Sequence, residues 1–122
     1  MKDFRNLLVW QKAHEIALSV YKSTKHFPVD ERFGLTSQMR RSSPSVPTNI
    51  AEGCGRGSDP DFKRFLQIAF GSTSELDYQL ILALDLGLLT TDVHNELGAK
   101  LTEVQKMLAA LIRKVRNGAV SD

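Results

Sequence analysis

The residues that could do chemistry in this 122-residue sequence begin with His14 and Glu15, which stand side by side. Zinc proteases carry His-Glu-x-x-His on one helix, so that two imidazoles one turn apart hold the metal. Leu18 occupies the place of the second histidine here, and no glutamate has the histidine three residues later that di-iron bundles use. The sequence therefore predicts no metal site, and His14, His26 and His94 are expected on the surface or at helix edges.

The glycine-rich segment at residues 53–58, GCGRGS, has some of the look of a phosphate loop. A dinucleotide fingerprint would need glycine at Ser58 and a preceding strand, and the Gly-Lys-Ser/Thr of a P-loop is missing. The pattern favours a helix that ends at Gly53, followed by a turn into the next helix. The alternative is a backbone anion site beside Arg56 at the start of that next helix.

Cys54 is the single cysteine, so neither an internal disulfide nor a Cys-x-x-Cys metal pair can form, and no histidine lies near it in sequence to activate the thiol. Glu52 and Glu75 lie close to apolar stripes, and we expect them to be partly buried structural carboxylates, one of which Arg40 or Arg41 neutralises. Acid catalysis by this pair lacks any accompanying polar group. The chain is predicted to be no enzyme, with no cofactor and no small-molecule substrate.

Composition predicts one domain spanning residues 1–122, since 42% of the residues are hydrophobic and 25% are charged. The N-terminal stretch resembles neither a signal peptide nor a membrane span, so a cytoplasmic protein away from membranes is expected. The net charge is +2, but residues 1–41 hold eight Lys/Arg against four Asp/Glu, and residues 42–122 hold eight against ten. A solvated helical face is the first interpretation of the basic N-terminal part, and nucleic-acid binding is the alternative.

Apolar residues three and four positions apart predict two regular helices at the ends of the chain. The helix at 6–26 stops before Pro28, and the helix at 91–117 begins after Thr90 or Thr91 and ends before Gly118. The first apolar stripe consists of Trp10, Ala13, Ala17, Val20, Thr24 and Phe27. The second consists of Val93, Leu97, Leu101, Val104, Leu108, Leu111 and Val115.

A third helix is expected at 59–86, with Ser58 or Asp59 as N-cap, Pro60 in the first turn and Gly87 after the end. Its apolar face is unusually broad, and several further apolar residues lie beyond it. These extra residues are Ile68, Ile81, Leu82 and Leu86. A helix this apolar is expected to contact a partner helix in another subunit.

The remaining helix, second in chain order, is expected at 31–54 and contains Pro44 and Pro47. Each proline costs about 3 kcal/mol in a helix interior. A three-to-four spacing nevertheless continues across the prolines if one irregular turn follows Arg41. We predict one helix kinked at Pro47. A helix, a short irregular turn and a new helix near Pro47 form the alternative interpretation.

Motifs across nearly the whole chain resemble the four-helix-bundle proteins encoded in intervening sequences of bacterial 23S ribosomal RNA genes. These motifs are VWQKA at 9–13, FP at 27–28, ERFGL at 31–35, QMRR at 38–41, VPxNIAEG at 46–53, FLxIA at 65–69 and SEL at 74–76. The resemblance implies an all-α, antiparallel up-and-down four-helix bundle that assembles into a closed homopentameric ring. The motif residues expected to matter structurally are Pro47, Asn49, Glu52, Gly53 and Glu75.

The accessory variability determinant of diversity-generating retroelements is similar too, and that likeness implies binding to RNA and to a reverse transcriptase. Basic residues flank the proline-containing helix and the glycine-rich turn, and a ring would repeat them. The candidate RNA or anion contacts are Arg40, Arg41, Arg56, Lys63 and Arg64. The sequence therefore predicts a non-enzymatic oligomeric scaffold, with an RNA-binding accessory protein as the alternative.

Overall fold

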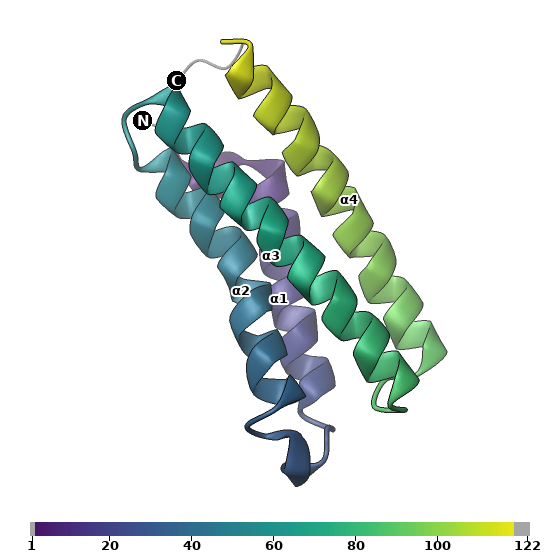
Figure 1. Ribbon diagram of the computed structural model, residues 1–122. Coiled ribbons are helices and arrows are strands. Elements are labelled where there is room, and N and C mark those ends of the chain that lie inside the picture. Colours follow the sequence, from purple (N-terminus) through teal and green to yellow (C-terminus); the bar gives the residue numbers. More distant parts are fainter. Residues whose placement is uncertain (1, 119–122) are drawn as a thin grey trace.

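The computed structural model describes residues 2–118, and in that range the chain is all-helical, with no strand. Four α-helices run up and down in turn (Figure 1). They are α1 (Leu8–Thr24), α2 (Leu35–Cys54), α3 (Asp59–Asp85) and α4 (Thr91–Arg116), with short 3₁₀ helices η1 (Phe4–Asn6) and η2 (Val29–Glu31) before α1 and α2. The predicted all-α four-helix fold is confirmed.

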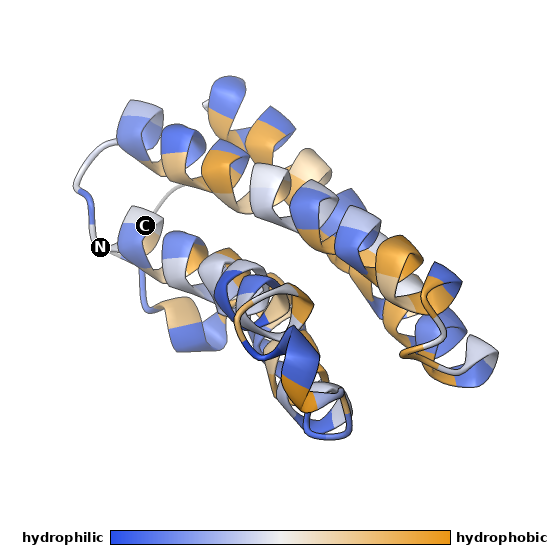
Figure 2. Ribbon diagram, turned by 60° about the horizontal axis from the view of Figure 1, so that its bottom comes forward, coloured by the Kyte–Doolittle hydropathy of each residue, from blue (hydrophilic) through white to orange (hydrophobic). Residues whose placement is uncertain are grey.

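The helices form a four-sided arrangement, because α1 and α3 each contact α2 and α4 but do not contact each other. The side made by α1 and α2 therefore lies opposite the side made by α3 and α4. Apolar and polar residues alternate along every helix (Figure 2). Fully buried side chains come from all four helices and include Val20, Met39, Ile50, Leu66, Leu76, Leu80, Leu101, Val104 and Leu108.

Helix ends follow the chemistry of their capping residues. The Ser58 hydroxyl accepts a hydrogen bond from the backbone N–H of Asp61 at 3.4 Å, and Thr90 does the same for Val93 at 3.2 Å. Gly87 and Gly118 have φ of +75° and +69°, in the left-handed region that suits glycine after a helix end. These ends match the sequence prediction and fix where α3 and α4 begin and end.

Helix α2 is continuous from Leu35 to Cys54, with Pro44 and Pro47 inside it. The alternative of two helices, with a new one starting near Pro47, is therefore wrong, and so is the irregular turn that the single helix was expected to have after Arg41. Pro44 has no N–H to offer the Arg40 carbonyl one turn earlier. The Tyr21 hydroxyl of α1 donates to that carbonyl instead, at 3.3 Å. The neighbouring helix thus replaces a hydrogen bond that the proline removes, which propensity within α2 cannot show. A kink at Pro47 stays a prediction.

Buried polar side chains join the central helices. The Ser42 hydroxyl of α2 donates to the buried Gln79 Oε1 of α3 at 2.5 Å, and Gln105 Nε2 of α4 donates to the Thr73 hydroxyl of α3 at 3.1 Å. Neither pair was evident in the sequence. Each is satisfied, so the buried polar atoms do not carry the cost of an unmade hydrogen bond.

Gly53 lets the end of α2 lie against the start of α3. A Cβ at this position would lie 2.9 Å from the Cβ of Phe65 and 3.1 Å from Cδ1 of Phe62. The first of these distances is too short for two carbon atoms, and Phe65 Cβ is fixed to its backbone. The glycine of the VPxNIAEG motif is therefore required by the approach of the two helices.

We expect Gly53→Ala to lower the free energy of unfolding by about 1–3 kcal/mol, because the added methyl group overpacks the α2–α3 contact. Gly98→Ala is the matched control, since a Cβ at Gly98 in α4 meets nothing within 4 Å. That change should raise stability by about 0.5–1 kcal/mol through helix propensity. Urea denaturation followed by circular dichroism measures both, and equal effects of the same sign would contradict the packing role of Gly53.

Candidate interaction surfaces

A groove of about 560 Å³ lies between α1 and α2. Trp10 stacks on His14 with ring centroids 5.2 Å apart, and Phe4 meets Trp10 edge-on at 4.9 Å. Pro44 and Pro47 contribute apolar rings on the α2 side. The other lining residues are Ala17, Leu18, Tyr21, Thr48 and Ala51. We call this hollow the α1–α2 groove; its lining is mainly apolar and aromatic.

The opposite side of the bundle is apolar as well. Ile68, Tyr78 and Ile81 on α3 are 43%, 61% and 45% exposed. A shallow hollow of about 280 Å³ is lined by Gln67 and Phe70 of α3 and by Ala109 and Ile112 of α4. Ile81 comes eleven positions after Phe70 and so lies on the same side of α3. We call the residues of this hollow together with Ile81 the α3–α4 face. The apolar residues that the sequence placed beyond the core stripe are thus at the surface, except Leu82, which is half-buried.

Arg40 belongs to the contact between α1 and α2. Its Nε donates to the buried Thr24 hydroxyl at 2.8 Å, and its Nη2 donates to the Tyr21 carbonyl at 3.3 Å. The guanidinium also lies 4.9 Å from the centroid of the Tyr21 ring. These contacts hold the side chain against α1.

Arg56 and Arg64 both lie over the ring of Phe65, with guanidinium carbons 4.9 and 4.6 Å from its centroid. Arg56 pairs with Glu52 at 3.7 Å, and Arg64 pairs with Asp61 at 3.8 Å. Phe65 is only 5% exposed. The two arginines therefore cover an aromatic ring and have a carboxylate each, which reduces the charge they present.

Arg41 and Lys63 are the other two predicted basic contacts. Neither side chain forms an ion pair or hydrogen bond within residues 2–118. Arg41 lies in α2 and Lys63 in the first turns of α3. The structure thus does not gather the five predicted residues into one site: Arg40 and Arg41 lie apart from the turn that carries the other three.

Sequence reasoning missed basic residues that share the end of the bundle with this turn. The last turn of α4 carries Arg113, Lys114 and Arg116, all exposed, and Val115 between them is buried. Figure 1 shows this end of α4 at the same end as the α2–α3 turn. The segments 2–10, 48–66 and 108–118 that meet here hold eight Lys/Arg against four Asp/Glu. We call it the basic end; its signal in the sequence was the RKVR run, which alone indicates only a helix C-terminus.

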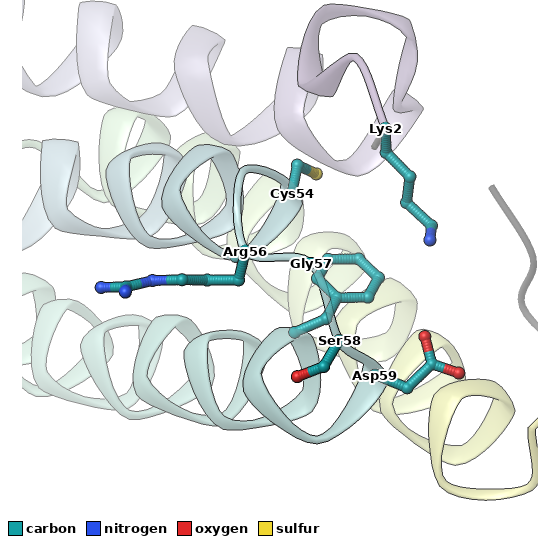
Figure 3. Close-up of a pocket in the computed structure, with 8 residues that line it drawn as sticks. Lys2, Cys54, Arg56, Gly57, Ser58 and Asp59 are labelled. Atoms are coloured by element: carbon teal, nitrogen blue, oxygen red, sulfur yellow. The ribbon is translucent and has the colours of Figure 1, made fainter.

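The glycine-rich turn encloses a pocket of only about 30 Å³ beside Cys54, Ser58 and Asp59 (Figure 3). That volume is close to one water molecule's share of liquid water. The Arg56 side chain extends away from the pocket, while the Asp59 carboxylate stands near it. The turn therefore connects two helices and encloses little space beside Arg56.

Glu52 and Glu75 are exposed, and the prediction that they are partly buried is wrong. The partner of Glu52 is Arg56, one turn later, rather than Arg40 or Arg41. Both glutamates lie at helix positions just outside the buried stripe, and the helix rotation that places Ile50 and Leu76 inside leaves them in solvent. Asn49 is half-buried, and its Nδ2 donates to the Ser45 carbonyl at 2.8 Å; the Ser45 hydroxyl meets that of Ser72 in α3 at 2.8 Å.

The pKa values of Lys12 and Asp3 are shifted; Lys12 is half-buried and Asp3 is exposed. The hydrogen bond and charge of Glu103 in α4 raise the pKa of Lys12 in α1, where Nζ and Oε1 are 2.7 Å apart. Hydrogen bonds from the side chain and backbone of Arg5 lower the pKa of Asp3. Each shift accompanies an ion pair on the surface, and neither group lies in the α1–α2 groove.

Residues 2–118 contain neither a cluster of metal ligands nor a helix suited to a membrane. No three His, Cys, Asp or Glu side chains there lie close enough together to hold a metal ion. None of the described helices combines the length and apolar character needed to cross a bilayer.

Comparison with known proteins identifies relatives of the whole bundle. Residues 5–110 match the family described as 23S rRNA-intervening sequence protein. A crystal structure of a protein with unknown function from the S23 ribosomal protein family of Bacteroides thetaiotaomicron is similar, with 29% identity and a TM-score of 0.77 over 86% of this chain and 98% of that one. None of the curated proteins matches the sequence.

Arg40 and Arg41 provide a matched test of which arginine stabilises the fold. We expect Arg40→Ala to cost about 1–2 kcal/mol of unfolding free energy, because the Thr24 hydroxyl and Tyr21 carbonyl lose their donor. Arg41→Ala should change stability by less than about 0.5 kcal/mol, as usual for a surface residue. Chemical denaturation compares the two, and a larger loss for Arg41→Ala would show that the contacts of Arg40 carry no stability.

Proposed function

The chain belongs to the family of 23S rRNA-intervening sequence proteins, and we propose that it is a non-enzymatic interaction scaffold built from several copies of itself. One observation carries the proposal: the bundle has apolar surfaces on two opposite sides. The α1–α2 groove lies on one side, and the α3–α4 face lies on the other. A bundle that acted alone would expose both of them to water.

Surfaces on opposite sides suit a head-to-tail contact between copies. In such a contact the α3–α4 face of one copy lies in the α1–α2 groove of the next, and each copy still has one free surface of each kind. Repetition either closes into a ring or continues as a filament. The family resemblance supports the ring and implies five copies.

The chemistry of the α1–α2 groove supports a binding role rather than a catalytic one. His14 is stacked on Trp10, and the Tyr21 hydroxyl is engaged by the Arg40 carbonyl. Thr48 is the remaining polar side chain of the lining, and no carboxylate is present there. Hydrolytic or acid–base catalysis needs a nucleophile or base with an orienting partner, and the groove offers no such pair.

RNA binding is the second candidate function, and the basic end favours it. Lys63, Arg113, Lys114 and Arg116 are basic residues of this end that form no ion pair within the described part of the chain. A ring would repeat them once per copy, and repeated weak phosphate contacts add up through avidity. The name of the family points in the same direction.

We predict a mass near five times the 13.6 kDa chain in light scattering coupled to gel filtration at micromolar concentration. Ile81→Arg should keep the helical circular dichroism spectrum but lower that mass, because Ile81 is 45% exposed on the α3–α4 face. Leu80→Arg, one residue earlier, should unfold the chain, because Leu80 is fully buried and the arginine would lack a partner. A wild-type monomer at these concentrations would refute the scaffold proposal.

For the second candidate, fluorescence anisotropy with a structured RNA should show affinity that falls steeply with salt. Reversing Lys63 and Lys114 to glutamate should weaken binding and reduce the log–log salt slope by about 1 for each phosphate that the variant no longer neutralises. The control reverses Lys25 and Lys106, which changes net charge equally away from the basic end. An equal weakening in the two double variants would mean that net charge alone, not a site, attracts RNA.

A further inference from the structure

Phe33 is 90% exposed, more than any other large apolar side chain in the described part of the chain. It lies in the connection between α1 and α2, where Val29 is 76% exposed as well. The α1–α2 groove and the α3–α4 face do not include it. A phenyl ring this free of its own chain is a candidate contact for another molecule.

The backbone that carries Phe33 is firmly built. Glu31 N donates to the Pro28 carbonyl at 2.9 Å, Arg32 N to Val29 at 3.0 Å and Gly34 N to Glu31 at 3.1 Å. The Glu31 carboxylate then accepts from the backbone N–H of Leu35 at 3.1 Å and caps α2. The turn therefore fixes the backbone on both sides of Phe33 and presents the ring outward, at little cost in conformational entropy when a partner binds.

A hollow that suits this ring lies at the same end of the bundle. It has a volume of about 450 Å³ and lies between the end of α1 and the connection from α3 to α4. Leu88, Leu89 and Val93 supply its apolar surface, and His26 lies at its α1 side. We call it the end hollow. Its volume accommodates a phenyl side chain together with part of the turn that carries it.

We propose that Phe33 of one copy inserts into the end hollow of the neighbouring copy. This inference rests on the proposed self-assembly and adds a specific contact to it. When bundles stand side by side around a common axis, a contact must join surfaces at the same height along the bundles. Phe33 and the end hollow meet this condition, whereas the α1–α2 groove extends toward Phe4 and Ala51 near the opposite end.

The turn that carries Phe33 and the surroundings of the end hollow each have one acidic and one basic residue. These charges can pair across a contact, which favours a second copy as the occupant. Asp30 and Arg32 flank the turn that carries Phe33. Lys22 lines the end hollow, and Asp92 lies beside it in the first turn of α4. All four side chains belong to exposed residues, and none forms an ion pair within residues 2–118. A neighbouring copy could therefore pair acid with base on both sides of the inserted ring.

The first test removes the phenyl ring of Phe33. Phe33→Ser should raise the concentration at which the assembly dissociates at least tenfold, as measured by light scattering over a dilution series. Because Phe33 contributes nothing to the buried core, the helical circular dichroism spectrum should not change. Leu8→Ser is the control, since Leu8 is a 56% exposed residue at the other end of α1.

The second test locates the contact without relying on stability. Copies carrying Phe33→Cys are mixed with copies carrying Leu88→Cys, allowed to exchange and then oxidised. A disulfide-linked pair containing one chain of each variant is expected, and Leu8→Cys mixed with Leu88→Cys should give none; Cys54 is buried and common to all samples.

The outcomes separate this inference from the function on which it rests. An assembly of unchanged mass and dissociation concentration after Phe33→Ser, without the mixed disulfide, overturns the Phe33 contact and leaves the scaffold proposal standing. A wild-type chain that is monomeric throughout the dilution series overturns both. A dissociation shift for Phe33→Ser together with the mixed disulfide supports the contact.

Discussion

Helix α2 depends on its neighbours more than any other element of this bundle. Two prolines remove backbone donors from its interior, and each would cost about 3 kcal/mol in an isolated helix. The hydroxyl of Tyr21 serves the carbonyl that Pro44 leaves free, and Arg40 ties α2 to the end of α1 at the same place. On its other side Gly53 allows α3 to approach without a clash. The bundle and its second helix therefore form together.

Several basic residues make contacts within the bundle. Arg40 holds two helices together, and Arg56 and Arg64 cover the ring of Phe65 while each pairs with a nearby carboxylate. Their charge is largely used inside the chain. The basic end still has Lys63, Arg113, Lys114 and Arg116 without an ion pair in the described part of the chain, and α2 has Arg41. A nucleic-acid site at the basic end would combine the end of α4 with the glycine-rich turn.

The prolines also shape the surface. The apolar rings of Pro44 and Pro47 help to make the α1–α2 groove apolar, and the stacked rings of Trp10 and His14 continue it. Pro44 and Pro47 thus destabilise α2 as a helix but give it a surface suited to apolar partners. The exposed side chains of Ile81 and Phe33 are apolar without belonging to the buried core. Assembly would give all three surfaces a role.

The sequence by itself determined the four helices, the caps at Ser58 and Thr90 and the core stripes, because these follow from local hydrogen bonding and from the 3.6-residue period. It also determined the family, through motifs spread along the chain. Tertiary structure alone decided that α2 continues through its prolines. The hydroxyl that compensates for Pro44 comes from Tyr21, nineteen positions before the Arg40 carbonyl that accepts its hydrogen bond. It decided that Glu52 and Glu75 are exposed, because a small rotation of a helix moves a residue at the edge of a stripe into solvent. It also brought the end of α4 to the α2–α3 turn, since a charge site made of segments far apart in sequence has no local pattern.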